Sequence, residues 1–377
     1  MSLFELAVVL AVGLAGPLLA SPKRVRVPVV VGEIALGVVV GRTGTGWVRA
    51  DQPVLSFLAT AGFALVMLEA GSHVPLRDPS LRVALRRGAL LAACVGVVSV
   101  PAGFGIAALV GTGHGLLYAV LLASSSAALV LPTISELRLT STALVVQVAI
   151  ADTVCIVAVP LAEDPTRAGR AALGALAVIG AGTALVLLMR RSRGLLLRMH
   201  MLSKRRNFGL ELRLNLIILF GLAELAQLVG VSVMLAGFVA GLALATQGTP
   251  RRLARQLFAV TDGFLAPVFF VWLGASLDLR ALVERPRMIA LAVLLAVGTV
   301  AVHAVAKLLG QPLPLAVLAG AQLGVPVAAV TIGGHALFAG EGAAILAAAL
   351  VSVAVAGYAA VVASRRSTEG ADGGQGR

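Results

Sequence analysis

Apolar segments long enough to cross a lipid bilayer recur along the whole chain, and they constrain its fold more than any other feature. A membrane-spanning helix needs about 20 predominantly apolar residues. Of the 377 residues, 59% are hydrophobic and only 12% are charged, whereas a soluble protein carries about 25% charged residues. The sequence therefore predicts an all-α polytopic membrane protein. It argues against a soluble enzyme, a disordered chain and a nucleic-acid-binding domain.

Charged residues, glycines and prolines divide the chain into thirteen apolar segments. We predict helices at residues 3–20, 27–41, 54–73, 89–110, 115–135, 141–162, 171–189, 209–229, 231–246, 257–277, 288–310, 313–338 and 342–363. If the N-terminus lies outside and the C-terminus in the cytoplasm, most Lys and Arg residues fall in cytoplasmic connections, as the positive-inside rule requires. The net charge of +13 is thus interpreted as topology in a cell membrane, with no nucleic-acid partner.

The thirteen segments are interpreted as two inverted repeats of six helices joined by one linker helix, an architecture found in many secondary transporters. Small residues occupy similar positions in GEIALGVVVG of the second segment and LAGFVAGLAL of the ninth. Chance matching of Gly and Ala is the alternative. We expect one transmembrane domain over residues 1–363, beginning with a retained first helix and not a cleaved signal. Residues 364–377 are expected to form a disordered cytoplasmic tail.

Asp152 is the ionisable residue most deeply placed within a predicted helix. It lies in the middle of QVAIADTVCIVAVPL, with no Lys or Arg within a helical turn. Ionisable groups in membrane helices are costly, so they are functional candidates by default. A carboxyl group in this position is suited to binding either a proton or a cation. The alternative is a permanently protonated structural residue bonded to a neighbouring helix.

Two other segments carry prolines that favour an interruption of the helix. The fifth reads LLASSSAALVLPTISEL and contains Pro132, and the twelfth reads AGAQLGVPVAAVTIGG and contains Pro326. A proline inside a helix frees a backbone carbonyl, and Ser125, Ser126 and Thr133 offer hydroxyls nearby. Interrupted helices at matching places in two repeats predict an ion site at the bilayer midplane. Two ordinary proline kinks are the alternative.

The remaining ionisable residues within the segments are secondary candidates. Glu33 and Glu69 are either proton-pathway residues or structural hydrogen-bonding groups, and the structural role is favoured. Lys307 is expected to extend its amino group to the cytoplasmic interface, and His303 lies one turn away on the same face. The other members of this set are His335, Glu224 and Asp262, the last two expected near the membrane interface.

The cysteines show no pattern of metal ligands. Cys94 and Cys155 both lie in apolar sequence, where we expect them to serve in packing. No nucleophile–base pair stands out either, so the sequence predicts no cofactor, no resident metal and no enzymatic activity.

Several stretches in order along the chain resemble the monovalent cation:proton antiporters of the Kef and bacterial sodium/proton exchanger type. They are PVVVGEIALGVVVGRTGTG, LVMLEAGSHVPL, LLASSSAALVLPTISEL, the segment around Asp152, ELAQLVGVSVMLAGFVAGLAL and FLAPVFFVWLGASLDL. The resemblance implies a homodimer with a dimerisation domain and a mobile core. It also implies two crossed, interrupted helices in the core, and Asp152 as the aspartate at which protons and cations compete.

The chain departs from that family pattern at three places. Ala151 stands where many members have an acidic or amide residue beside the aspartate, and no lysine occurs near Gly298, where many members place one. Leu323-Gly324-Val325 replaces a common Arg-Gly-Glu. These departures leave Asp152 as the main titratable group. With one carboxylate, we predict exchange of one monovalent cation, Na⁺ or K⁺, for one proton, without net charge movement. The alternative is a transport-inactive or regulatory membrane protein that keeps the fold.

Overall fold

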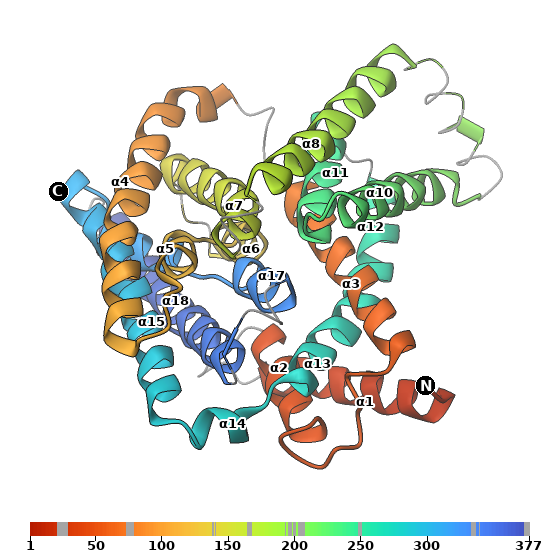
Figure 1. Ribbon diagram of the computed structural model, residues 1–377. Helices are drawn as coiled ribbons and strands as arrows, with labels where there is room; N and C mark the ends of the chain where they lie inside the picture. Colours follow the sequence, from red (N-terminus) through yellow and green to blue (C-terminus); the bar gives the residue numbers. More distant parts are fainter. Residues whose placement is uncertain are drawn as a thin grey trace.

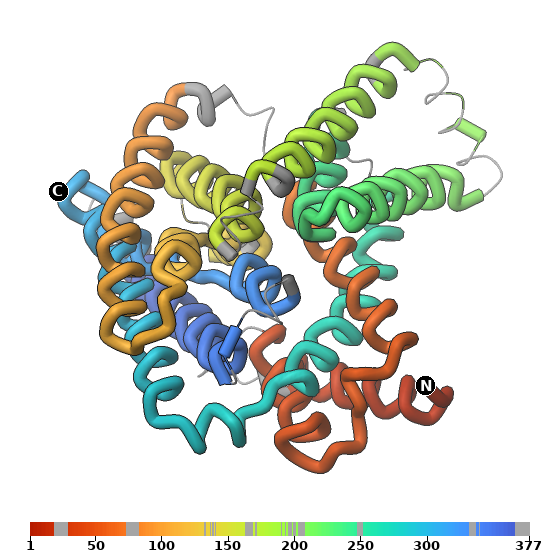
Figure 2. The backbone as a smooth tube through the Cα atoms, in the orientation of Figure 1, coloured from red at the N-terminus to blue at the C-terminus, as the bar shows by residue number. Residues whose placement is uncertain are grey.

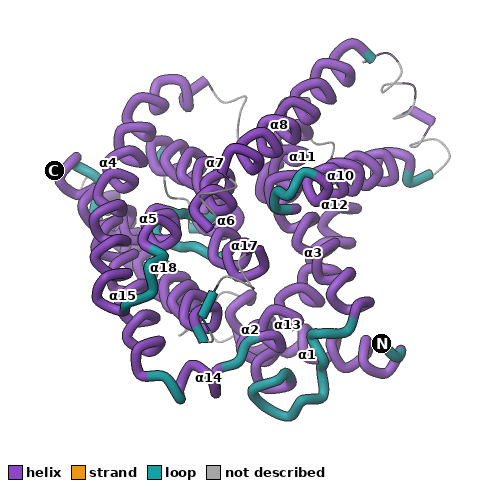
Figure 3. Tube along the Cα trace, viewed as in Figure 1, coloured by secondary structure: helices purple, strands orange, loops and turns teal. Residues whose placement is uncertain are grey.

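The computed structural model describes most of the chain as helices. The described residues are 1–20, 29–72, 79–137, 139, 141–163, 168–192, 194, 198, 201–202, 208–247, 251–332, 337–338 and 340–372. Within these ranges every regular element is helical, as Figure 3 shows. The prediction of an all-α architecture is therefore confirmed.

The helices form two groups, seen at the left and right of Figure 1. The core group packs around α7 and α15. Its members are α4 (Pro79–Val110), α5 (Gly115–Ala123), α6 (Ala127–Glu136), α7 (Thr142–Glu163), α15 (Pro286–Ala304), the 3₁₀ helix η3 (Val305–Leu309), α16 (Leu313–Ala319), α17 (Gly324–Ile332) and α18 (Glu341–Asp372). α18 continues beyond residue 363, at which we placed the end of the membrane domain; that boundary stays a prediction.

The flanking group packs around the contact between α3 and α11. Its members are α1 (Leu3–Ala20), α2 (Val29–Val40), α3 (Pro53–Ser72), α10 (Leu210–Leu228), α11 (Val233–Gln247), α12 (Arg251–Val260), the π-helix η2 (Thr261–Leu265) and α13 (Ala266–Ser276). The short α14 (Leu279–Val283) leads from this group back to the core group. Helix α8 (Ala168–Arg191) contacts α7 on one side and α10 and α11 on the other, so it bridges the groups (Figure 2).

Eight helical stretches among the described residues are long and apolar enough to cross a membrane. They are Pro53–Ser72, Val83–Val110, Thr142–Ala162, Ala172–Met189, Arg252–Ser276, Pro286–Leu309, Leu313–Thr331 and Glu341–Arg365. Four shorter apolar helices accompany them: Leu3–Leu18, Val29–Val40, Gly115–Leu131 and Val233–Thr246. The protein is thus a polytopic membrane protein, and the number of thirteen crossings stays a prediction.

Connections that the predicted topology assigns to the same side of the membrane are bonded to one another. The hydroxyl of Thr43, after α2, donates to the carbonyl of Leu277 at 2.6 Å. At the opposite side, Arg87 near the start of α4 donates to the carbonyl of Gly310 at 3.3 Å. These contacts support the predicted alternation of helix directions. Which side is outside stays a prediction.

Small residues allow the flanking helices to approach closely. Gly37 of α2 lies against Gly274 of α13, where a Cβ atom on Gly37 would lie 3.0 Å from the Gly274 Cα. Gly71 of α3 faces Gly241 of α11 in the same way, at 3.0 Å from the Cα of Gly241. In the predicted inverted repeat, α2 corresponds to α11 and α3 corresponds to α13. The α2–α13 pair and the α3–α11 pair would therefore be equivalent. The contacts support the repeat, which itself stays a prediction.

Candidate functional site

Two interrupted helices meet inside the core group. Residues 124–126 separate α5 from α6, and residues 320–323 separate α16 from α17. The backbone N–H of Ser126 donates to the carbonyl of Ala321 at 2.8 Å, and the hydroxyl of Ser125 donates to the carbonyl of Ala319 at 2.6 Å. All four residues are buried. The two non-helical segments thus satisfy each other's backbone groups, as they must where water cannot do so.

A chain of neutral side chains ties the interruptions to α15. The hydroxyl of Ser124 donates to the side-chain carbonyl of Gln322. The amide nitrogen of Gln322 in turn donates to the hydroxyl of Thr299 at 3.0 Å. Because an amide group has both a donor and an acceptor, Gln322 joins three buried elements with one side chain. This series of hydrogen bonds fixes the two interruptions relative to each other and to α15.

Asp152 lies beside the first interruption. It is halfway along α7 and only 3% exposed. Its Oδ2 accepts a hydrogen bond of 2.8 Å from the backbone N–H of Ala127, the first residue of α6. A helix N-terminus carries a partial positive charge and stabilises a carboxylate placed on it. No Lys or Arg ion pair with Asp152 is found within the described part of the chain.

The predicted oxygen shell is only partly brought together. Ser125 and Ser126 lie at the first interruption, close in sequence to Ala127. Thr133 lies two turns further along α6, where its hydroxyl donates to the Leu129 carbonyl of its own helix at 2.7 Å. Position 132 is also inside α6. The interruption that we placed at Pro132 therefore lies at residues 124–126, because the serines there leave the helix and bond to the end of α16 and to residues 321–322 of the second interruption.

His303 lies at the second interruption, whereas Lys307 does not. The His303 imidazole is 1% exposed, and its Nδ1 lies 3.0 Å from the Thr299 carbonyl oxygen. A Cβ on Gly320 would lie 3.4 Å from the ring, so the imidazole packs against residues 320–323. Lys307 is exposed in η3. The two side chains therefore differ in burial, and a role for both in one proton pathway stays a prediction.

The acidic candidates Glu33 and Glu69 belong to the flanking group. Glu33 of α2 is 4% exposed and packs against Gly16 of α1. Glu69 of α3 is half-buried. Glu224 and Asp262 are both exposed. His335 lies outside the described residues.

Sequence reasoning missed the polar residues that complete the core. Besides Gln322 and Thr299, these are Gln147 on α7 and Gln311 after η3, whose side chains are joined by a hydrogen bond of 2.8 Å. All four residues are at most 5% exposed. The available signal was chemical: an amide or hydroxyl within an apolar segment needs a partner. The identity of that partner depends on helix packing.

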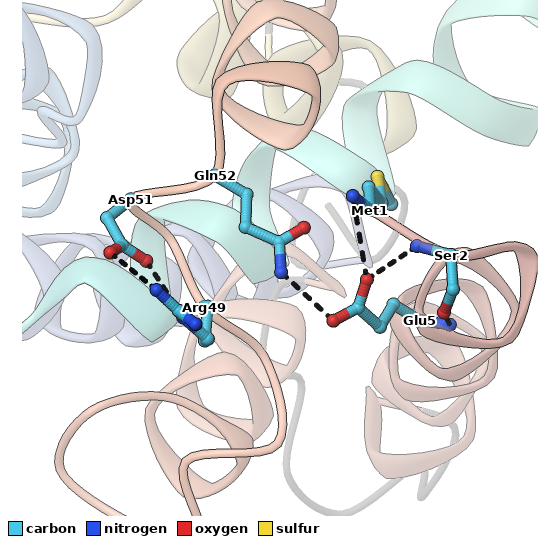
Figure 4. Close-up of polar contacts among 6 residues, drawn as sticks. All are labelled: Met1, Ser2, Glu5, Arg49, Asp51 and Gln52. Atoms are coloured by element: carbon cyan, nitrogen blue, oxygen red, sulfur yellow. Dashed lines mark hydrogen bonds and ion pairs between the residues drawn. The ribbon is translucent and has the colours of Figure 1, made fainter.

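Charged residues at the start of α1 and in the connection between α2 and α3 form a separate set of polar contacts, as Figure 4 shows. Arg49 and Asp51, in the connection between α2 and α3, form an exposed ion pair of 3.2 Å. Arg49 holds the pKa of Asp51 below its ordinary value. Glu5 accepts hydrogen bonds from the backbone N–H of Ser2 and from the side chain of Gln52, which tie the start of α1 to this connection. Asp51 therefore stays ionised in neutral solution and makes a suitable control for Asp152.

The fold and the site together define a class of protein. Crossed helix interruptions beside a carboxylate inside a polytopic helical bundle are the arrangement by which secondary transporters bind ions. The sequence model of the sodium/hydrogen exchanger transmembrane family matches residues 7–366. The chain belongs to this family.

Curated relatives agree with this assignment. A putative Na⁺/H⁺ antiporter of Bacillus subtilis is 24% identical over 75% of this chain and 49% of its own length. The Na⁺/H⁺ antiporter of Enterococcus hirae is 24% identical over 74% of each chain. The glutathione-regulated potassium-efflux protein KefC of Salmonella typhi is 30% identical over 75% of this chain and 47% of its own length. The chain thus spans about half the length of the Bacillus and Salmonella relatives.

A solved structure has the same overall fold. The sodium proton antiporter MjNhaP1 of Methanocaldococcus jannaschii superposes with a TM-score of 0.63 and 15% sequence identity, over 96% of both chains. At this identity the likeness concerns the fold alone. It shows that the helices are arranged as in that solved structure.

Proposed function

We propose that the protein is a secondary active transporter that exchanges a monovalent cation, Na⁺ or K⁺, for a proton by alternating access. The observation that carries the proposal is the hydrogen bond between Asp152 and the first residue of α6, at the place where two interrupted helices cross. Family membership supports the same reaction.

The geometry suggests how Asp152 performs the exchange. When the carboxylate is ionised, the N-terminus of α6 stabilises its charge, and a monovalent cation neutralises it. When a proton binds, the charge is gone and the cation loses its main ligand. The hydroxyls of Ser125 and Ser126 and backbone oxygens around residues 124–126 and 319–322 complete the cation's oxygen shell. One carboxylate therefore holds either species and never both.

Protons need a route between Asp152 and water. We propose His303 as the pathway residue nearest the site, because its ring packs against the second interruption. Glu33 and Glu69 are proposed as acidic residues of the flanking group on the cation or proton route. Lys307 is proposed to mark the cytoplasmic end of the proton route. The flanking group supplies the homodimer contact in this proposal.

The proposal extends to assembly and location. We infer a multi-pass protein of the plasma membrane with its N-terminus outside and its C-terminus in the cytoplasm, in contact with lipid and without enzymatic activity. Residues 1–363 form the exchanger domain, and 364–377 a tail.

Exchange of one cation for one proton moves no net charge. Purified protein in proteoliposomes should therefore release protons from the lumen when Na⁺ or K⁺ is added outside, at a rate that is independent of an imposed membrane potential. Each elementary charge moved would otherwise be worth about 2.3 kcal/mol per 100 mV. Lumenal pH is measured with a fluorescent indicator while a lipophilic ion sets the potential. A rate that changes steeply with potential would contradict the stoichiometry.

The second candidate function is a non-transporting membrane protein with the same fold. Ala151 and Leu323-Gly324-Val325 favour it, since charged or polar residues common in the family are absent from these positions. The same proteoliposomes distinguish the two functions. No proton movement with Na⁺, K⁺ or Li⁺ would favour the inactive protein.

A further inference from the structure

Three cations gather at one end of the core group, where α4 begins and η3 ends. Arg86 and Arg87 lie near the start of α4, and Lys307 lies in η3. All three are exposed. The Nη2 atom of Arg87 donates to the carbonyl of Gly310 at 3.3 Å, and the backbone N–H of Gly310 donates to the carbonyl of Lys307 at 2.9 Å. Two elements that are far apart in the sequence thus bring their cations to one place.

The surrounding helices supply no negative charge to offset these cations. The sequences of α4, α15, η3 and α16 contain no Asp or Glu. No ion pair of Arg86, Arg87 or Lys307 is found within the described part of the chain. By contrast, the exposed Arg49 between α2 and α3 is paired with Asp51. The three cations are therefore available to an anionic ligand.

The surface beside the cations is apolar along two contacting helices. α4 and α15 pack against each other, at the left of Figure 1. A spacing of four or seven residues places side chains on one face of a helix, and each of these helices exposes apolar residues at such a spacing. They are Leu90, Val97 and Phe104 on α4 and Ile289, Val293 and Val297 on α15. We call these two sets the exposed stripes. Both helices belong to candidate membrane spans, so the stripes face the acyl chains of lipid.

The cations lie where the exposed stripes end. Arg86 comes one turn before Leu90 on α4, on the same exposed face. Lys307 and the exposed Leu308 follow the last turn of α15. The predicted topology places this end of both helices in the cytoplasm. A ligand that fits has a negative headgroup at the membrane boundary and apolar chains along the stripes. These are the properties of an anionic phospholipid, which Lys and Arg at the ends of membrane helices attract.

We propose that Arg86, Arg87 and Lys307 bind the headgroup of an anionic phospholipid whose acyl chains lie along the exposed stripes of α4 and α15. Guanidinium groups donate paired N–H groups to phosphate oxygens, and the ammonium group of Lys307 adds a point charge. A headgroup held by both elements joins the start of α4 to η3, in addition to the hydrogen bond between Arg87 and Gly310. The bound lipid therefore stabilises the folded protein. This site does not depend on the proposed exchange of cations.

The test compares wild type with the double variant Arg86→Gln/Lys307→Gln. No hydrogen bond of these two side chains is found within the described residues, whereas Arg87 is kept because it bonds to Gly310. Binding of phosphatidylglycerol to the delipidated protein in a neutral detergent is measured by native mass spectrometry. Each cation removed should weaken this binding about fivefold, and the double variant should bind about 25-fold more weakly. Phosphatidylcholine has a phosphate but no net charge, so it should bind weakly and equally to both proteins.

The matched control is Arg255→Gln/Arg287→Gln, which removes the same charge from exposed positions in α12 and at the opposite end of α15. It should bind phosphatidylglycerol as wild type does. Phosphatidylglycerol at about 100 times the wild-type Kd should raise the Tm of wild type and control by about 3 °C or more. The Tm of the double variant should rise clearly less. If the double variant does not fold, Lys307→Gln with its fivefold loss provides the same comparison.

Equal affinity of wild type and the double variant for phosphatidylglycerol would overturn the proposal. An equal loss in the control would overturn it too, because it would show a general attraction of anionic lipid and no defined site. Inorganic phosphate at the same concentration as the lipid should not displace it, since free phosphate has no acyl chains. Displacement would mean that the headgroup alone is bound and that the exposed stripes take no part. Because every readout is lipid binding or Tm, the outcome is independent of whether the protein exchanges cations for protons.

Discussion

Replacing Asp152 by asparagine should reduce cation/proton exchange to the level of protein-free liposomes. The side-chain oxygen of the introduced amide can still accept the hydrogen bond that Asp152 receives from Ala127 at 2.8 Å. The local structure should therefore persist. The amide cannot take up and release a proton and carries no charge to attract a cation. Proton release from the lumen after a cation pulse measures the effect.

The matched control is Asp51→Asn, the same chemical change at an exposed carboxylate. Asp51 lies in the connection between α2 and α3 and is paired with Arg49, so its replacement should leave the exchange rate unchanged. Equal size-exclusion profiles and Tm values for both variants would show that the loss is not caused by misfolding. Wild-type exchange in Asp152→Asn would remove this residue from the mechanism.

Replacing Gly241 by valine should strongly destabilise the packing of α11 against α3. A Cβ atom at position 241 would collide with the Leu68 carbonyl oxygen of α3 and would lie 2.8 Å from the Cα of Gly71 and the backbone nitrogen of Ser72. These are backbone atoms, which cannot relieve the clash by a change of rotamer as a flexible side chain can. We expect a loss of stability of about 3 kcal/mol, the upper end for overpacked interiors. The yield of monodisperse protein and its Tm report the effect.

Gly221→Ala in α10 is the control for that substitution. No heavy atom lies within 4 Å of a Cβ atom at position 221, and alanine is a better helix former than glycine. The control should keep the wild-type yield with an equal or higher Tm. A wild-type Tm for Gly241→Val would mean that α3 and α11 do not pack as closely as described.

Much of this architecture follows from the sequence, because the backbone can form few structures inside a lipid bilayer. An apolar segment of membrane length must satisfy its backbone hydrogen bonds internally, which makes it a helix. For the same reason Asp152, in the middle of such a segment, could be recognised as a candidate without any knowledge of its neighbours. That the segments around Pro132 and Pro326 are interrupted was predicted from these prolines and from the polar and glycine-rich residues beside them.

The positions and partners within the site were not predictable in the same way. Pro132 suggested an interruption at its own position, yet the helix breaks earlier, where Ser124 and Ser125 bond to residues almost two hundred positions away. Pro326 falls in the first turn of α17, where a missing N–H costs little. The polar partners Gln322 and Thr299 are ordinary residues in sequence. They matter because tertiary packing brings them together.

Competition between protons and the cation at one carboxylate is the central claim, and the pH dependence of the apparent KM tests it most directly. Initial rates of tracer-cation exchange are measured in proteoliposomes over a range of cation concentrations at several symmetric pH values. If Asp152 holds either ion but never both, acidification should raise the apparent KM, by about tenfold per pH unit at the acid limit. Saturating cation should then restore the rate. An apparent KM that stays constant while the maximal rate falls would contradict the account.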